Sequence, residues 1–194
     1  HIKTARKESG ADVMKKLLIT GSNGFIGKYL CKECLENKID FRAMSRSGQC
    51  PVFPNWGYQA DLLDQAAIEK ILQDYQPDTI IHLAAIASPV HNNITEIYNV
   101  NVHGTEILLN AASKYLSKGT KLILASTAGV YGNQPVPLLH EDLSYNPVNH
   151  YSYSKMVVEM LARQYTQEME ICIVRPFNII GIGQDKNFFI SKLV

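Results

Sequence analysis

Residues 20–27 read Thr-Gly-Ser-Asn-Gly-Phe-Ile-Gly and follow an apolar run, residues 16–20, that has the length of a strand. Glycines at three-residue intervals permit a tight turn and leave space where a side chain would collide with a ligand or a packed backbone. We expect Gly21 to make the turn, Gly24 to admit phosphates, and Gly27 to let helix and strand pack closely. The helix that begins in this stretch points its free N–H groups at the turn, which predicts a dinucleotide-binding site.

From this turn onward, strand-like and helical patterns alternate. Apolar runs of strand length recur at residues 40–45, 79–84, 121–126 and 171–175, with a weaker one at 58–62. Helical patterns lie between them at residues 25–36, 63–75, 94–115 and 151–168. Because runs such as 79–84 are apolar on both faces, the alternation predicts an α/β fold with a doubly wound parallel sheet, the Rossmann arrangement. The proline-rich stretch 131–149 is predicted to be a long loop, and long loops in compact domains are usually functional.

Composition is typical of a globular protein with small-molecule partners. Hydrophobic residues make up 46% of the chain and charged residues 19%, which argues against disorder. A net charge of +1 without a basic cluster gives no footprint for nucleic acid or an anionic membrane surface. No apolar run approaches the ~20 residues of a spanning helix, and residues 1–13 lack the apolar centre of a secretory signal. We therefore expect a soluble, cytoplasmic protein.

The length of 194 residues suits one domain with a substantial core. Met14 directly precedes the first strand, so we interpret residues 1–13 as a leader or cloning remnant and residues 14–194 as the folded domain. Cys31 and Cys34 form a CxxC pattern, but no second pair and no suitably spaced histidines follow. Residues i and i+3 share one face of a helix, so we expect this pair to lie in a helix without binding a metal.

The end of the second strand bears on the choice of dinucleotide. In this fold an acid there binds the adenosine ribose 2′-hydroxyl, whereas an arginine accommodates a 2′-phosphate. The sequence Phe-Arg-Ala-Met-Ser-Arg at residues 41–46 contains no acid. Arg46 therefore favours NADP over NAD as the cofactor. The alternative is a solvated arginine on a loop, which leaves NAD open.

Tyr151 and Lys155 stand four residues apart and so share one face of a helix. A neighbouring ammonium and an oxidised nicotinamide both favour a phenolate, and lowering the pKa of Tyr151 by ~3 units requires ~4 kcal/mol. Tyr151 could then exchange a proton with a carbonyl or hydroxyl while hydride moves. Tyr153 lies two residues from Lys155 and would point elsewhere. A hydroxyl from Ser126 or Thr127, at the carboxyl end of a strand, could bind the reacting oxygen.

Seven segments in order resemble one family, the extended short-chain dehydrogenase/reductases, and within it the NAD(P)-dependent epimerase/dehydratase group that acts on nucleotide sugars. The resemblance runs from Met14 to the end of the chain and rests on residues 20–27, Asp61, 82–85, 101–105, 126–132, 151–155 and 175–184. It implies a Rossmann domain followed by the start of a substrate-binding region at about residues 176–194. Members of the family are longer, so the lobe that grips nucleotide and sugar would be largely absent from this chain.

The resemblance also implies roles for the matching positions. Thr127 would be the catalytic hydroxyl with Ser126 as its neighbour, and Tyr151 would be the acid/base. Lys155 would hold the nicotinamide ribose. Together with Arg46, the expected cofactor-binding residues are Gly21, Asn23, Gly24, Phe25, Ile26, Gly27, Asp61, Leu62, Leu83, Ala84, Ala85, Asn101, Tyr151 and Lys155. The residues expected to face the sugar are Ser126, Thr127 and Asn178. The family commonly forms homodimers through two helices, here around residues 94–115 and 151–168.

The residues after Thr127 narrow the range of reactions expected for this protein. Family dehydratases carry an acid there, whereas this chain has Ala128 and Gly129, so a 4,6-dehydratase is disfavoured. Segment 175–192 resembles reductases that convert GDP-4-keto-6-deoxy-mannose to GDP-rhamnose, and Arg46 agrees because a reductase can consume NADPH. A nucleotide-sugar 4-epimerase with recycled NAD is the alternative. A non-catalytic NAD(P)-binding regulatory module is a third hypothesis, which the presence of all three catalytic residues disfavours.

Overall fold

A six-stranded parallel sheet forms the centre of the protein, whose computed structural model describes residues 16–87 and 93–184. The strands are β1 Leu17–Thr20, β2 Phe41–Ser45, β3 Gly57–Gln59, β4 Thr79–His82, β5 Lys121–Ala125 and β6 Glu170–Val174. Their order in the sheet is β3-β2-β1-β4-β5-β6, and Leu17 pairs in parallel with both Phe41 and Thr79. The predicted doubly wound sheet is confirmed. Its order reverses between β1 and β4, which is where sheets of this kind bind ligands.

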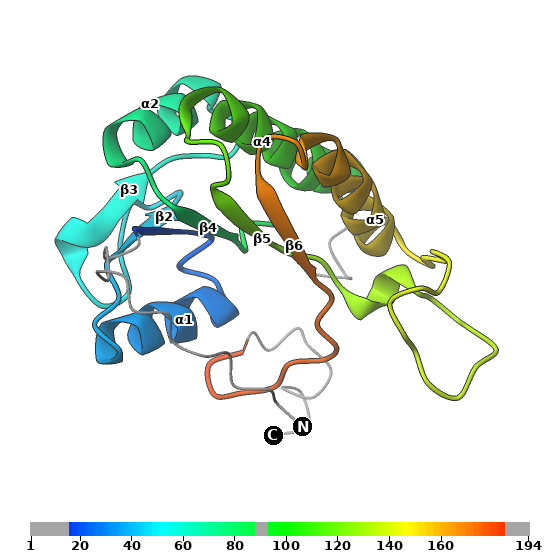
Figure 1. Cartoon of the computed structure of the whole chain (residues 1–194). Coiled ribbons are helices and arrows are strands. Elements are labelled where there is room, and N and C mark those ends of the chain that lie inside the picture. Colours follow the sequence, from blue (N-terminus) through cyan, green and yellow to red (C-terminus); the bar gives the residue numbers. More distant parts are fainter. Residues whose placement is uncertain (1–15, 88–92, 185–194) are drawn as a thin grey trace, which may run out of the picture.

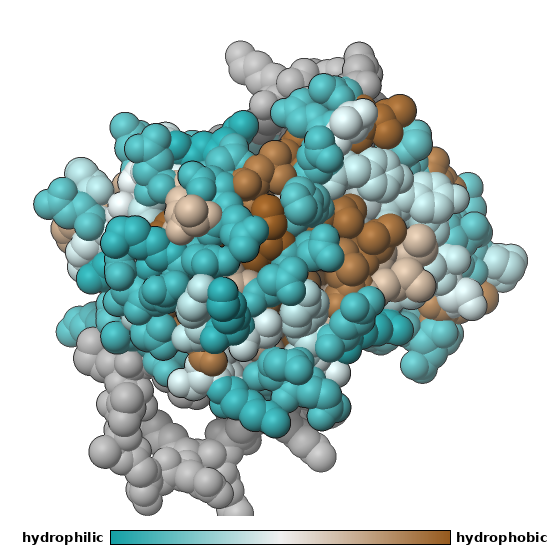
Figure 2. All heavy atoms as spheres, turned by 90° about the horizontal axis from the view of Figure 1, so that it is seen from above, coloured by the Kyte–Doolittle hydropathy of each residue, from teal (hydrophilic) through white to brown (hydrophobic). Residues whose placement is uncertain are grey.

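Helices cover the two faces of the sheet unequally (Figure 1). The helices α2 (Gln65–Tyr75), α4 (Gly104–Tyr115) and α5 (His150–Ala162) lie together on one side, and α1 (Phe25–Glu36) lies on the other. The short helical pieces are η1 Pro54–Trp56, α3 Ile94–Tyr98, η2 Asn99–His103, η3 Ala128–Val130 and η4 Arg163–Tyr165. Seen from the side of α2, α4 and α5, apolar residues gather among polar ones on the surface (Figure 2). Within residues 16–87 and 93–184, none of the helices is long and apolar enough to span a bilayer.

Two of the predicted helices differ from expectation. Residues 94–115 are helical throughout, but the π-turn η2 interrupts them between α3 and α4. The helix predicted for residues 151–168 ends as an α-helix at Ala162, because the chain must reverse through η4 and a turn to enter β6 at Glu170. Residues 131–149 contain no helix or strand, so the predicted loop is confirmed. The expected leader 1–13 and the last residues of the expected substrate region, 185–194, lie outside the described residues.

Alternating positions along the strands build two cores. Leu18 of β1 packs with residues of α2, α4 and α5, whereas Leu17 and Ile19 pack with residues of α1. Cys31 and Cys34 are buried on the sheet-facing side of α1, so their predicted place on a helix face is confirmed. Because every strand runs in the same direction, the carboxyl ends of all six lie along one edge. The loops that follow them carry the predicted site residues.

Candidate functional site

The glycine turn joins β1 to α1 at this carboxyl edge. Gly21 has φ +68°, and a Cβ there would lie 2.6 Å from the Ala84 backbone nitrogen, so only glycine fits. A Cβ at Gly27 would lie 2.7 Å from the Ser22 Cα, which explains how closely α1 packs on the turn. Of the described atoms, a Cβ at Gly24 would approach only the Gly21 carbonyl oxygen, at 3.1 Å. Gly24 therefore leaves the approach to the helix open.

The first turn of α1 faces this approach with unbonded amides. Its N-cap is Gly24, and no side chain in the described part of the protein caps it. The first N–H groups of a helix have no acceptor within the helix, and together with the helix dipole they attract anions. Phe25 and Ile26 hold the first helical positions, and Ile26 is 40% exposed. The turn thus has both the space and the donors that a dinucleotide pyrophosphate needs.

The segment after β2 lies beside the glycine turn. Asn23 Nδ2 donates to Ser45 Oγ at 3.1 Å and to Ser47 Oγ at 2.6 Å, which ties the turn to both neighbours of Arg46. The Arg46 side chain is exposed. A hollow of about 580 Å³ opens at Asn23 and is lined by Asn23, Lys28, Lys32, Gln49, Cys50, Pro51 and Val52. An arginine and two lysines therefore give this end of the turn a positive character.

A buried histidine connects the turn to β4. His82 Nδ1 lies 2.7 Å from Thr20 Oγ1, and its Nε2 lies 2.9 Å from Thr105 Oγ1. Thr105 gives its own proton to the Asn101 carbonyl oxygen, so His82 Nε2 must donate and Nδ1 must accept from Thr20. Thr20 in turn accepts from the Ala84 N–H at 3.2 Å. Burial, followed by the charge of a neighbouring lysine, lowers the pKa of His82 to about 3, so the ring is neutral in this tautomer.

Asn101 lies in η2 and holds the segment that follows β4. Its side-chain oxygen accepts from the Ile86 N–H at 2.7 Å, and its Nδ2 donates to the Ile86 carbonyl oxygen at 3.1 Å. The same Nδ2 donates to Ser154 Oγ of α5 at 3.0 Å, and Ser154 donates to the Tyr151 carbonyl oxygen at 2.7 Å. The Asn101 amide is thus engaged with protein groups. Single π-turns often occur at functional sites, and this one places Asn101 between two elements of the site.

Lys155 lies under the end of β5. Its Nζ donates to the Ala125 carbonyl oxygen at 2.8 Å. Burial lowers the pKa of Lys155 to about 8, although the Glu159 carboxylate opposes this shift. Burial also raises the pKa of Tyr151. The expected lowering of the Tyr151 pKa, which involves a bound oxidised nicotinamide together with Lys155, stays a prediction.

Ser126 and Thr127 follow β5 and have different surroundings. Ser126 is 3% exposed and donates a hydrogen bond to Glu159 Oε1. Thr127 is half-buried and accepts from the Gly129 N–H at 3.1 Å. A Cβ on Gly129 would lie 2.5 Å from Ser152 Oγ, so Gly129 packs against the first turn of α5, which carries the candidate acid/base tyrosine. The structure thus places Thr127 in the corner between the end of β5 and the first turn of α5, which we call the catalytic corner. It turns the Ser126 hydroxyl toward the interior.

A buried ion pair lies behind this corner, and the sequence analysis missed it. Glu159 is fully buried and accepts from Arg175 at 2.7 Å and from Tyr145 at 2.8 Å. Burial alone would raise the pKa of Glu159, but hydrogen bonds from Arg175, Ser126 and Tyr145 hold it below its usual value. The available signal was position, since Glu159 stands one helical turn after Lys155 on the inner face of α5.

The other predicted residues lie along the same edge of the sheet. They are the half-buried Leu83, Ala84 and Ala85 after β4, the exposed Asp61 and the buried Leu62 after β3, and the exposed Asn178 after β6. Asp61 Oδ1 accepts from the Leu63 N–H at 2.9 Å, which shapes the turn before α2. Together with the glycine turn, Arg46 and Thr127, these residues follow the ends of all six strands, and they lie on one edge because the strands are parallel.

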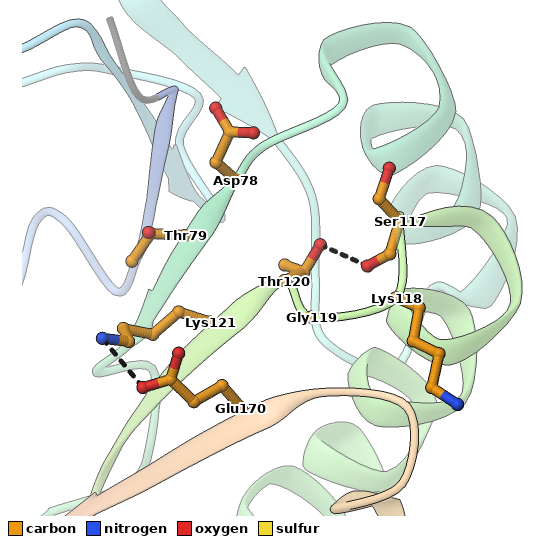
Figure 3. Close-up of a pocket in the computed structure, with 8 residues that line it drawn as sticks. All are labelled: Asp78, Thr79, Ser117, Lys118, Gly119, Thr120, Lys121 and Glu170. Atoms are coloured by element: carbon orange, nitrogen blue, oxygen red, sulfur yellow. Dashed lines mark hydrogen bonds and ion pairs between the residues drawn. The ribbon is translucent and has the colours of Figure 1, made fainter. Parts of the chain in front are cut away.

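A second hollow lies at the opposite, amino edge of the strands (Figure 3). Its volume is about 260 Å³, and it is lined by Asp78, Thr79, Ser117, Lys118, Gly119, Thr120, Lys121 and Glu170. Lys121 and Glu170 form an ion pair at 3.0 Å, and Thr120 donates to the Ser117 carbonyl oxygen at 2.8 Å. Because open parallel sheets bind ligands at the carboxyl ends of their strands, the glycine-turn edge is the candidate site and this hollow is not.

Comparison with known proteins agrees with this geometry. The model of the NAD dependent epimerase/dehydratase family matches residues 17–194, so the chain belongs to that family. It is 37% identical to the GDP-6-deoxy-D-talose 4-dehydrogenase of Aggregatibacter actinomycetemcomitans, over 92% of this chain and 58% of that protein. It is 30% identical to the GDP-6-deoxy-D-mannose reductase of Pseudomonas aeruginosa, over 92% of this chain and 57% of that protein.

A solved structure shares the fold. The UDP-glucose 4-epimerase of Thermus thermophilus in complex with NAD has a TM-score of 0.79 and 26% identity to this chain. The match covers 88% of this chain and 58% of that one. The chain therefore spans somewhat more than half the length of the relatives it matches. The expected family is confirmed. These relatives are named for reactions of GDP- or UDP-linked sugars, and the Thermus thermophilus epimerase is in complex with NAD.

Proposed function

We propose that the protein is an NAD(P)-dependent oxidoreductase that acts on a nucleotide-linked sugar. The observation that carries this proposal is the meeting of β5 with α5 at the edge that also bears the glycine turn. There Lys155 is bonded to the Ala125 carbonyl, and Thr127 lies beside the helical turn of Tyr151. A phenol, a hydroxyl and a dinucleotide-binding turn at one edge suit hydride transfer coupled to proton transfer.

The side chains divide the chemistry between them. A bound nicotinamide would supply or accept the hydride. Tyr151 is a neutral phenol at pH 7, because burial raises its pKa, and it is suited to donate a proton to a carbonyl oxygen that is being reduced. Thr127 would hold that oxygen by a hydrogen bond. Lys155, fixed by the Ala125 carbonyl, would direct its remaining N–H groups to the nicotinamide ribose.

We infer that the substrate is a 4-keto-6-deoxy sugar nucleotide, which is reduced at the ketone. Ala128 and Gly129 follow Thr127, and neither side chain can remove a proton as a dehydratase requires. Two of the relatives are named for GDP-linked 6-deoxy sugars, which supports this class of substrate. Asn178, exposed after β6, is the residue we propose to face the sugar.

We propose NADP as the cofactor, because the exposed Arg46 follows β2, and Lys28 and Lys32 line the hollow at Asn23 beside the turn. The test is a titration with NADPH and with NADH, followed by cofactor fluorescence, on the wild type and Arg46→Asp. We expect tighter binding of NADPH and a loss of that preference by about tenfold or more in the variant. Lys70→Asp on α2 changes the charge equally at an exposed position and should leave the preference intact.

A nucleotide-sugar 4-epimerase with recycled NAD is the second candidate function. The observation in its favour is that the Thermus thermophilus epimerase, which shares the fold, holds NAD. Preference for NADH, or NAD retained through purification, together with epimer formed without net cofactor consumption, would select this alternative. Failure of the protein to bind either dinucleotide would contradict both.

A further inference from the structure

The carboxylate of Glu159 receives hydrogen bonds from three separate segments of the chain. Ser126 comes from the end of β5, Tyr145 from the long loop before α5, and Arg175 from the residues after β6. The Arg175 guanidinium also lies over two aromatic rings, 5.0 Å from the centre of Tyr131 and 5.2 Å from that of Tyr145. One buried residue of α5 thus gathers the segments that surround the catalytic corner.

The same carboxylate lies one helical turn from Lys155. Residues four apart are neighbours on a helix face, and the charge of Glu159 opposes the burial that lowers the pKa of Lys155. The other titratable groups near Lys155 are His82 on β4, which is neutral and interacts with the Lys155 charge, and Tyr151, which stands one helical turn before it on α5. Arg175 forms an ion pair with Glu159 and partly offsets its charge.

A gain in stability of the fold does not by itself explain why the charged carboxylate of Glu159 is buried. A buried ion pair is often no more stabilising than well-packed apolar residues of the same volume. Glu159 instead contacts Ser126, whose neighbour Thr127 is the proposed catalytic hydroxyl, and it stands beside Lys155. Glu159 therefore bonds the neighbour of the proposed catalytic hydroxyl and stands one helical turn from the lysine proposed to hold the nicotinamide ribose.

We propose that Glu159 is a positioning residue, which holds Thr127 in place through Ser126 and keeps the Lys155 amine charged. The inference rests on the proposed function. It predicts one effect on the charge of Lys155 and another on the position of Thr127, and two different substitutions of Glu159 distinguish them. Glu159→Gln removes the charge and keeps the shape of the side chain, whereas Glu159→Asp keeps the charge and shortens its reach.

The effect on charge is tested by titrating Lys155 directly. NMR of the ¹³Cε signals of labelled lysine follows the titration, with the Lys155 signal assigned from its absence in Lys155→Arg. We expect the midpoint to fall by about one pH unit or more in Glu159→Gln and to stay close to wild type in Glu159→Asp. Tyr145→Phe removes one hydrogen bond and no charge, so it should also leave the midpoint unchanged. An unchanged midpoint in folded Glu159→Gln would overturn this part.

The effect on position is tested by hydrogen exchange and mass spectrometry. We expect faster exchange in peptides covering residues 126–131 in both Glu159 variants, and no change in the exposed-surface variant Asp74→Asn. Equal protection in the variants and the wild type would overturn this part. If Glu159→Gln fails to fold, the double variant Glu159→Gln/Arg175→Gln, which removes both charges of the pair, replaces it in both measurements.

The outcomes also separate this inference from the proposed function. Binding of NADPH or NADH by the wild type, with no shift of the Lys155 midpoint and no change in exchange, would overturn the role of Glu159 and leave the proposed function. A shifted midpoint in a protein that binds neither dinucleotide would overturn the proposed function, and with it the reaction that Glu159 is inferred to serve.

Discussion

The hydroxyl of Tyr151 carries the proton transfer proposed for this site. Tyr151→Phe keeps the ring that packs in the corner and removes the proton donor. We expect turnover to fall by about 10²–10⁴-fold, because a positioned acid or base contributes that much, while cofactor affinity stays within about twofold. The measurement is the rate of cofactor oxidation with a 4-keto-6-deoxy sugar nucleotide, accompanied by a fluorescence titration.

Tyr153 provides the matched control for that variant. It lies on the same helix, its side chain is 43% exposed, and Tyr153→Phe makes the same chemical change. We expect its activity to remain close to that of the wild type. An equal loss of turnover in the two variants would contradict the role assigned to Tyr151.

His82 makes the stability of the fold sensitive to acid. In the folded state it takes up a proton only near pH 3, whereas in the unfolded chain it does so near pH 6.5. The unfolded state therefore binds more protons between these values, and stability falls as the pH falls through that window. We expect a loss of about 2 kcal/mol between pH 7 and pH 5 from this group alone. Urea unfolding at both pH values measures it.

The control for this prediction removes the titrating group. His82→Gln should be less stable than the wild type at pH 7, because it breaks the bonds to Thr20 and Thr105, yet it should lose less stability on acidification. His140→Gln changes an exposed histidine and should keep the wild-type dependence on pH. Identical acid sensitivity in wild type and His82→Gln would show that other groups are responsible.

Residue types were easier to predict than residue surroundings. Strand position alone left Ser126 and Thr127 as alternatives, the family resemblance favoured Thr127, and the bond from Ser126 to Glu159 gives a physical reason for that choice. That bond joins residues 33 positions apart, and the one from Arg175 to Glu159 comes from yet another segment, so no local pattern contains them. The burial that raises the pKa of Tyr151 could not be read from the sequence either, since burial is a property of the folded chain.

At the scale of elements, two glycines of the β1–α1 turn have different roles, since Gly24 leaves space for the cofactor and Gly27 lets the helix pack against the turn. Gly24→Ala places its Cβ near only one described atom, so the fold should remain while the phosphates lose their space. We expect cofactor affinity to fall about tenfold or more with little change in thermal stability. Gly27→Ala places its Cβ against the backbone of the turn, and we expect a loss of stability of about 1–3 kcal/mol.

Both glycine variants are compared by thermal unfolding and by titration with NADPH. The prediction concerns the contrast between them, because each variant adds the same methyl group. A stable Gly27→Ala protein, or a Gly24→Ala protein that unfolds early and binds the cofactor normally, would contradict it.

The elements themselves were largely predictable. Strands and helices alternate with clear apolar periods, and the positions of β1, α1 and α2 follow from the pattern within a few residues. The π-turn η2 was not predictable, since residues 94–115 have an ordinary helical period. The early end of α5 also escaped prediction, because it is set by where β6 must begin.

At the scale of the whole molecule, the face formed by α4 and α5 is where we expect a second copy to bind. Apolar residues gather on this face (Figure 2), and α5 exposes Tyr153 and Met160, the latter by 51%. Exposed apolar patches often mark interfaces between proteins. We expect Met160→Glu to weaken a homodimer by about tenfold or more, because it places a charge in an apolar contact.

Light scattering coupled to size-exclusion chromatography, over a range of protein concentrations, measures this effect. Lys70→Glu changes an exposed charge on α2 and serves as the control. A wild-type protein that remains a monomer at all concentrations would contradict the expected dimer. A dimer unaffected by Met160→Glu would place the interface elsewhere.

The π-turn at residues 99–103 interrupts the helical segment 94–115 between α3 and α4. Such a turn arises when one residue is inserted into an α-helix, so deleting a residue there would let α3 and α4 join as one regular helix. That helix would be locally more favourable, but the residues before the deletion would rotate by about 100° relative to those after it. Asn101 would then lose Ile86 or Ser154, and a related chain without the extra residue must join β4 to α5 by a different contact.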